Sequence, residues 1–233
     1  MKRSYNRRAA FTLVELLTVV IIIGFLAGMV AGTAPAVMRS VKSSAIRSEI
    51  QQLSMALEAY KAEFGEYPPD GTDSSAVTKH IRRCYPDATS TSIQTVTPET
   101  ALYIFLGPHC ANPKTPFDTS STNRTKGFFE FDKARLGSNK FVPSGCNEPY
   151  RYLKARGATG NKSYPTNYVA YKDVNGNWYN PETYQIVSAG LDDDWGPTGQ
   201  VTVQQSTFNN ANTKGGLDNV VNFGKKTIKD LID

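Results

Sequence analysis

Apolar residues dominate one long stretch near the start of the chain, from Phe11 to Met38, in which Glu15 is the only charged residue. About 20 apolar residues at 1.5 Å each span the hydrocarbon core of a bilayer. The pattern therefore predicts a transmembrane helix over residues 11–38. An ordinary secretory signal has an apolar run of only about 7–15 residues, although the small residues at 32–34 would offer such a signal a cleavage site.

A different pattern follows, in which apolar residues recur at spacings of 4, 3, 4, 3 and 4: Ile46, Ile50, Leu53, Leu57, Tyr60 and Phe64. This spacing puts them on one face of a helix. It predicts an amphipathic continuation of the helix over residues 39–64, packed by that face on the rest of the protein. Gly65 and the Pro68-Pro69 pair are expected to end the helix.

Residues 65–233 are expected to form one globular domain. Polar composition predicts a long loop with little helix over residues 70–100 and an extended loop over 107–148, with a short helix from Thr100 to Leu106 between them. Strand patterns occur at 150–153, 167–171 and 184–188, with an Asn175-Gly176 turn. The predicted fold is α+β, with a long amino-terminal helix packed on a small antiparallel sheet that carries long loops.

Charge is concentrated at the amino terminus. The chain has 26 basic and 21 acidic side chains, and four of the basic ones lie in residues 1–10, which contain no acid: Lys2, Arg3, Arg7 and Arg8. The remainder (26 minus 4, or 22 basic, against 21 acidic) is close to neutral, so no basic patch predicts nucleic-acid binding. Basic residues before an apolar span instead place the amino terminus in the cytoplasm and the following domain outside it.

Glu15 is the residue that a simple membrane anchor leaves unexplained. A carboxylate inside a span is costly and needs a partner. An uncleaved anchor that tolerates the cost, and a Glu15 that is solvated at the membrane interface, both remain open on these grounds.

The segment Ala10-Phe-Thr-Leu-Val-Glu-Leu-Leu17 resembles the processing site of type IV prepilins and type II secretion pseudopilins. The resemblance implies that prepilin peptidase removes a basic leader, residues 1–10, by cutting between Ala10 and Phe11, and that the new amino terminus of Phe11 is methylated. Ala10 stands where Gly is usual. Glu15 would then pair with the α-amine of a neighbouring subunit during assembly, because each charge offsets the desolvation of the other.

The resemblance further implies a non-enzymatic, structural subunit of a type II secretion pseudopilus, which polymerises helically for protein export. Its partners would be further copies of itself, other pseudopilins, prepilin peptidase and the assembly platform of the inner membrane. It would be a single-pass protein of that membrane with a periplasmic or otherwise extracytoplasmic domain. Two alternatives stay open: a type IV pilin or minor pilin for adhesion, motility or DNA uptake, and a membrane-anchored binding domain that never polymerises.

Three carboxylates, Asp192 to Asp194, directly follow the predicted strand at 184–188. By composition they are compatible with a solvated acidic turn, or with a loop that offers oxygen ligands to a hard cation. The segments Ile186–Asp192 and Leu217–Phe223 resemble the two parts of the calcium-binding loop of major pseudopilins. The resemblance implies calcium as a cofactor, with the side-chain ligands Asp192, Asp194, Asp218 and Asn219. Asn219 stands where a second Asp is common.

Cysteine and histidine are few. Cys84, Cys110 and Cys146 form no CxxC pair, and His80 and His109 are isolated, which argues against a zinc site. In an exported domain, one disulfide plus one free thiol is the simplest arrangement, and three unpaired thiols are the alternative. Because no nucleophile–base pair or phosphate-binding glycine pattern occurs, we expect no enzymatic activity.

Overall fold

The computed structural model describes residues 12–89, 95–118, 120–157, 162–208, 214–224 and 227–232. The chain divides after Val41 into two units, Met1–Val41 and Lys42–Asp233, which are described separately below. The fold is α+β, with a long amino-terminal helix followed by small sheets, as the sequence predicts.

Helix α1 spans Leu13–Phe64. Its first turn is capped by Thr12, whose Oγ1 accepts the backbone N–H of Glu15 at 3.2 Å. This Thr-x-x-Glu arrangement satisfies one of the backbone donors that the start of a helix leaves unpaired. At the other end, Gly65 has a φ of +81° and donates its N–H to Lys61 O at 2.8 Å. Glycine adopts this left-handed conformation without steric cost, so the helix ends where the sequence predicts.

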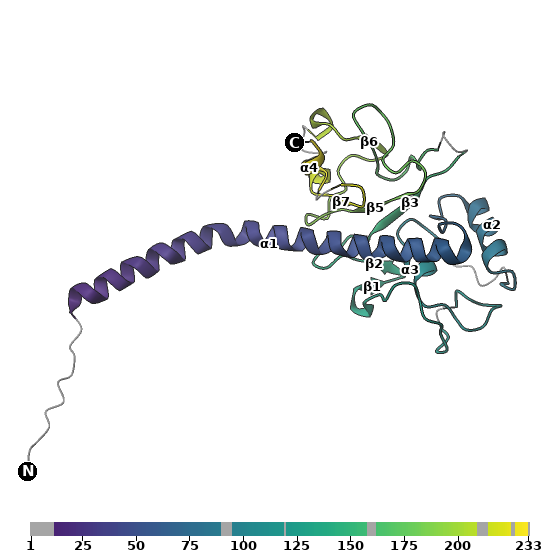
Figure 1. The fold of residues 1–233 in the computed structure, drawn as a ribbon, viewed down its shortest axis with the longest axis horizontal. Helices are drawn as coiled ribbons and strands as arrows, with labels where there is room; N and C mark the ends of the chain where they lie inside the picture. The colour runs from purple at the N-terminus through teal and green to yellow at the C-terminus, as the bar shows by residue number, and fades with distance from the viewer. Residues whose placement is uncertain are drawn as a thin grey trace, which may run out of the picture. The chain divides into compact units, whose positions relative to one another are not determined.

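The apolar stripe of α1 forms the centre of the main core. Ile46, Ile50, Leu53, Leu57 and Tyr60 are all at most 1% exposed, and Phe64 packs against the same cluster. Their partners come from the sheet and from the helix at 101–106, and include Tyr152, Ile186 and Phe105. Figure 1 shows the sheet lying along this part of the helix. The predicted packing of the stripe on the globular domain is therefore confirmed.

The sheets are small. Strands β3 (Arg151–Lys154), β5 (Tyr184–Ser188) and β7 (Val220–Val221) form an antiparallel sheet in the order β3-β5-β7. A second pair joins β4 (Ala170–Lys172) to β6 (Gln200–Thr202), and it is parallel, which the sequence did not predict. A hairpin of β1 (Leu136–Gly137) and β2 (Lys140–Phe141) completes the described strands.

Strand β5 is central and is buried on both faces. Tyr184 and Ile186 face the α1 core, whereas Val187 faces a second cluster formed with Tyr171, Val201 and other residues. The buried Gln185 side chain links β5 to β4: its Oε1 accepts Tyr171 N at 2.9 Å, and its Nε2 donates to Tyr171 O at 3.0 Å. The amide thus replaces backbone pairing where two sheets meet.

The segment between α1 and β3 contains more helix than its composition predicts. Helix α2 spans Ser74–Cys84, inside the region expected to be loop, and its first turn is capped by the Asp73 carboxylate. Helix α3, Ala101–Leu106, confirms the predicted short helix. The remaining described helical elements are η2 (Lys133–Arg135), η3 (Gln205–Phe208), η4 (Lys214–Leu217) and α4 (Lys229–Ile232).

The predicted disulfide is not found, because Cys84, Cys110 and Cys146 are all free thiols. Each thiol has different neighbours. Cys84 lies beside His80, and the Cys146 thiol donates to Gly190 O, while the backbone of Cys110 forms an isolated β-bridge with Arg124. The alternative arrangement of three unpaired thiols is the one that the structure has.

Candidate functional site

Glu15 lies in the first turn of α1, at a position where its backbone and its side chain both contact Thr12. The Thr12 hydroxyl accepts Glu15 N–H and lies 3.4 Å from Glu15 Oε2. Within the chain the carboxylate therefore contacts the residue that caps the helix, which the sequence analysis did not consider. The predicted cleavage site, Ala10 and Phe11, lies outside the described residues.

The first part of α1 exposes an apolar surface. Of the seventeen large apolar side chains that are exposed among the described residues, fifteen lie between Leu13 and Val41. Apolar surface on this scale marks a region that another protein or a membrane covers. Within the described part of the chain, however, no helix combines the length and the apolar character needed to cross a membrane. The predicted span over 11–38 includes residues 11, 30 and 32–36, whose side chains are not described.

The acidic loop begins directly after β5, where Ala189 and Gly190 turn the chain. Gly190 has a φ of +79°, and its Cα is so close to Asp218 that an added Cβ would lie 2.4 Å from Asp218 Oδ1. A glycine is required here both for the backbone conformation and for this close approach. It brings the two segments that resemble a calcium loop, 186–192 and 217–223, into direct contact.

Asp218 is the centre of this contact. Its Oδ2 accepts Leu191 N–H at 2.9 Å, whereas its Oδ1 is buried and has no hydrogen-bond partner among the described residues. The pKa of Asp218 is raised to about 7, chiefly by burial and also by the nearby charge of Asp192, whose carboxyl lies within hydrogen-bond reach; the hydrogen bond from Leu191 N–H partly opposes this rise. Two carboxyls this close need a proton or a cation between them.

Asn219 is fully buried beside Asp218. Its Nδ2 donates to Tyr171 Oη at 2.6 Å and to Trp195 O at 3.2 Å, which fixes the orientation of the amide. Its Oδ1 then remains without a partner in the described structure, like Asp218 Oδ1. Buried oxygens in native proteins are nearly always paired, so two orphaned ones in consecutive residues call for a ligand. Oxygen donors of this kind fit a hard cation such as calcium.

Asp194, the fourth predicted ligand, is placed differently. Its Oδ1 accepts Gly196 N–H at 2.9 Å, and its Oδ2 lies against Gly215, where a Cβ would approach it within 2.0 Å. Among the described contacts, the carboxyl of Asp218 meets that of Asp192 but not that of Asp194, and Asn219 directly follows Asp218 in the chain.

Asp193 has a role that the sequence analysis missed. It has a φ of +57°, and its carboxylate accepts Asn147 N–H at 2.7 Å and Glu148 N–H at 3.0 Å. Burial opposes its ionisation, but these hydrogen bonds prevail and lower the pKa of Asp193. Nothing in the spacing of the sequence signals this contact, because the two segments are about 45 residues apart.

Residues 5–31 match the family model of the prokaryotic N-terminal methylation motif. No curated protein and no solved structure matches the chain. The motif implies membrane anchoring through the amino terminus, processing by prepilin peptidase and self-assembly, and it indicates a structural protein rather than an enzyme. The chain thus carries a prepilin-type amino terminus, and the match supports a type IV pilin-like or pseudopilin protein.

Proposed function

We propose that this protein is a structural subunit of a type II secretion pseudopilus, held in the inner membrane and then assembled into a helical filament for protein export. The observation that carries the proposal is the methylation motif at the head of a helix whose apolar side chains are exposed from Leu13 to Val41. Before assembly lipid would cover this surface, and in a filament the same surface of neighbouring copies would cover it.

Cleavage before Phe11 would create a positively charged amine close in sequence to Glu15. In a filament of staggered copies, this amine would approach Glu15 of a neighbour, and the pair would fix the register of assembly. Thr12 already contacts the Glu15 carboxylate, so assembly would exchange or extend an existing contact.

The amino terminus tests the proposal first. Intact mass and amino-terminal sequencing of protein recovered from its native membrane should give a chain that starts at Phe11 and is one methyl group heavier than calculated. A chain that retains Met1 or Lys2 would indicate a simple anchor, and one that starts near residue 35 would indicate an ordinary secreted domain. Either result would overturn the filament proposal.

Glu15→Leu tests assembly itself, with Thr12→Ala as the matched control. Both variants remove the contact between the Thr12 hydroxyl and the Glu15 carboxylate. Thr12→Ala also removes the cap on the backbone N–H of residue 15, whereas only Glu15→Leu removes the charge. If Glu15 pairs with a neighbouring amine, Glu15→Leu should abolish filaments and secretion while Thr12→Ala should retain most of both. Equal behaviour of the two variants would show that the charge of Glu15 contributes nothing beyond its contact with Thr12. Long surface filaments with no effect on secretion would favour the type IV pilin alternative.

We also propose that calcium binds at Asp192, Asp218 and Asn219, with backbone carbonyls of the loop completing the ligands. The orphaned oxygens Asp218 Oδ1 and Asn219 Oδ1 support this proposal. A bound calcium ion would neutralise the facing carboxylates and hold the 186–192 and 217–223 segments together. Because it binds the folded loop, it would stabilise the fold by mass action.

A further inference from the structure

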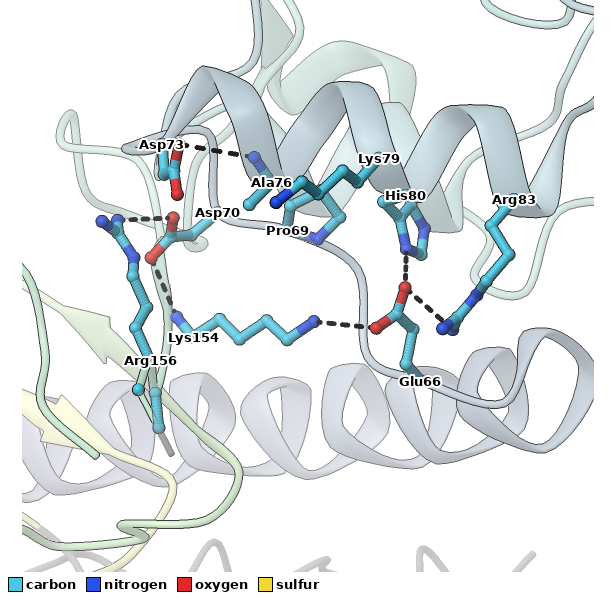
Figure 2. A pocket seen from close by; sticks show the side chains of 12 residues that line it. Glu66, Pro69, Asp70, Asp73, Ala76, Lys79, His80, Arg83, Lys154 and Arg156 are labelled. Carbon is cyan, nitrogen blue, oxygen red and sulfur yellow. Dashed lines mark hydrogen bonds and ion pairs between the residues drawn. The ribbon is translucent and has the colours of Figure 1, made fainter. Parts of the chain in front are cut away.

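A cavity of about 430 Å³ lies between α2, the turn after α1 and the end of β3. Among its lining residues are Glu66, Asp70, His80, Arg83, Lys154 and Arg156. Figure 2 shows the Glu66 carboxylate at one side of the cavity, facing both His80 and Arg83. None of its lining residues belongs to the methylation motif or to the acidic loop.

Three side chains with metal-binding atoms meet at this side. Glu66 Oε1 lies 2.7 Å from His80 Nδ1, and Cys84 Sγ lies 3.8 Å from the same nitrogen. All three ligand atoms are within 4.8 Å of one another. His80 and Cys84 are four residues apart on α2, which places them on the same face of the helix, one turn apart.

The His80 ring is held in the orientation that metal binding needs. Its side chain is 2% exposed, and its Nε2 lies 2.7 Å from the Tyr60 hydroxyl, which comes from the buried face of α1. Because Nδ1 lies 2.7 Å from the Glu66 carboxylate, Nδ1 carries the proton in the metal-free protein and Nε2 accepts the Tyr60 hydroxyl. Metal binding uses the other neutral tautomer, in which Nε2 donates to the Tyr60 oxygen and Nδ1 presents its lone pair to the ion. Burial lowers the pKa of His80, which favours the neutral ring. Metal-binding histidines are held by such a hydrogen bond from the second ring nitrogen.

The spacing of the three atoms suits a tetrahedral ion. Ligands at about 2.0–2.3 Å from zinc lie about 3.3–3.8 Å apart at tetrahedral angles. The His80–Cys84 distance of 3.8 Å already falls there, and the His80–Glu66 distance of 2.7 Å must lengthen by about 0.6 Å as the metal replaces the shared proton. Glutamate, histidine and cysteine together are ligands for zinc and similar borderline divalent ions.

We propose that Glu66, His80 and Cys84 bind a divalent transition-metal ion of the zinc type, with its remaining position open to the cavity. Three protein ligands and one open position leave room for water or for a donor group of another molecule. On binding, the Cys84 thiol loses its proton to solvent, and the Nδ1 proton of His80 moves by way of solvent to Nε2, which then donates to the Tyr60 oxygen. The freed Nδ1 lone pair, the Cys84 thiolate and the Glu66 carboxylate bind the ion.

Two cations compete for Glu66. Arg83 Nη2 lies 2.9 Å from Oε1, and Lys154 Nζ lies 3.7 Å from Oε2. The Arg83 side chain is 58% exposed, so its ion pair is weak and the side chain is free to turn into solvent. Lys154 Nζ has a second acceptor, Tyr67 O at 2.6 Å. On the far side of the cavity, the negative charge of Asp70 is paired with Arg156 at 3.0 Å.

Cobalt(II) is the probe, added alone to the full chain in detergent. Tetrahedral cobalt with a thiolate ligand has strong visible absorption and a sulfur-to-cobalt charge-transfer band, and zinc should displace it with loss of both. Because loss of even an outer hydrogen-bond partner weakens metal binding about 10–100-fold, Cys84→Ser should weaken cobalt binding at least about 10-fold and abolish the charge-transfer band.

The matched control is Cys110→Ser, which removes another thiol and should leave the spectrum unchanged. Glu66→Gln removes the charge at a half-buried position without emptying the core, and should weaken binding while the thiolate band remains. Absence of a thiolate–cobalt band in the natural chain would overturn the proposal. So would a band that survives in Cys84→Ser or disappears in Cys110→Ser. Asp218→Asn, in the acidic loop, should leave cobalt binding as it is.

Discussion

The carboxylate of Asp218 lies against Gly190, so closely that a single added methyl group at Gly190 would displace it. We therefore predict that Gly190→Ala destabilises the domain by about 2–4 kcal/mol, because it combines left-handed backbone strain with a clash against a partly buried charge. Urea unfolding of the two proteins measures the difference.

Gly176→Ala is the control for the backbone contribution. Gly176 has a φ of +82°, close to that of Gly190, but nothing lies within 4 Å of its absent Cβ. Gly176→Ala should therefore lower the free energy of unfolding by only about 1 kcal/mol. Equal losses in the two variants would show that contact with Asp218 contributes nothing.

Calcium should stabilise the natural chain, and Asp218→Asn should remove most of this effect. At about 100 times the dissociation constant, calcium adds about 2.7 kcal/mol, which is a rise of about 5–10 °C in Tm for a domain of this size. The isosteric amide removes the negative charge that holds the ion. Thermal unfolding in excess calcium and in chelator measures the effect.

Asp192→Ala should likewise lower Tm only when calcium is present, whereas Asp194→Ala should retain the calcium shift. Identical losses in calcium and in chelator for Asp192→Ala would contradict the calcium site. A lost shift in Asp194→Ala would restore the four-ligand prediction made from the sequence.

Glu49 joins α1 to the segment before β3. Its Oε2 accepts Arg135 Nη1 at 3.0 Å and the Tyr150 hydroxyl at 2.7 Å, and its side chain is 16% exposed. Glu49→Gln should cost about 1.5–3 kcal/mol, because it leaves the half-buried guanidinium of Arg135 with only the more exposed Asp132 as its anion. Chemical denaturation measures this loss. Glu182→Gln, in the more exposed Lys162–Glu182 pair, should cost less than about 1 kcal/mol, and an equal cost would show that burial does not matter.

His109 should make stability fall in acid. Burial lowers its pKa, a hydrogen bond to Ile104 O partly opposes this, and Arg124 adds to it. The unfolded imidazole takes up a proton near pH 6.5, before the native one does. The stability that the buried, neutral His109 contributes is therefore fully present above about pH 6.5 and is lost as the pH falls below that value.

His109→Gln should reduce the slope of the unfolding free energy with pH below about pH 6.5, measured by urea midpoints. The pKa of His80 is shifted in the same direction, so a residual slope should remain. An unchanged slope in His109→Gln would contradict the assignment.

Local patterns in the sequence predicted the fold wherever the structure depends on local spacing. The Ile46–Phe64 stripe, the stop at Gly65 and the central strand at 184–188 are confirmed. Helix α2 was missed because only Val77, His80 and Ile81 of its residues are buried, although Asp73 offered a capping signal. The parallel pairing of β4 with β6 joins segments about 30 residues apart, and no local pattern encodes such a contact.

The candidate sites, like the fold, were predicted only where the signal lies in local sequence. The resemblance of 186–192 and 217–223 predicted that Asp192, Asp194, Asp218 and Asn219 bind one ion, and among these the structure places the carboxyls of Asp192 and Asp218 within hydrogen-bond reach. That Asp218 Oδ1 and Asn219 Oδ1 are left without a described hydrogen-bond partner depends on their burial, which residue spacing cannot reveal. The Glu66, His80 and Cys84 cluster was missed because no CxxC pair is present and because the third ligand comes from a turn outside α2.

The position of the Thr12 cap has a consequence for maturation. The hydrogen bonds that start α1 use Thr12, Glu15, Leu16 and Thr18, all of which lie beyond the predicted cut between residues 10 and 11. A peptidase that cuts there would leave in place every hydrogen bond of the first helical turn that the described residues make. The described start of α1 would thus keep these contacts after processing, while the new amine would add a positive charge close to them.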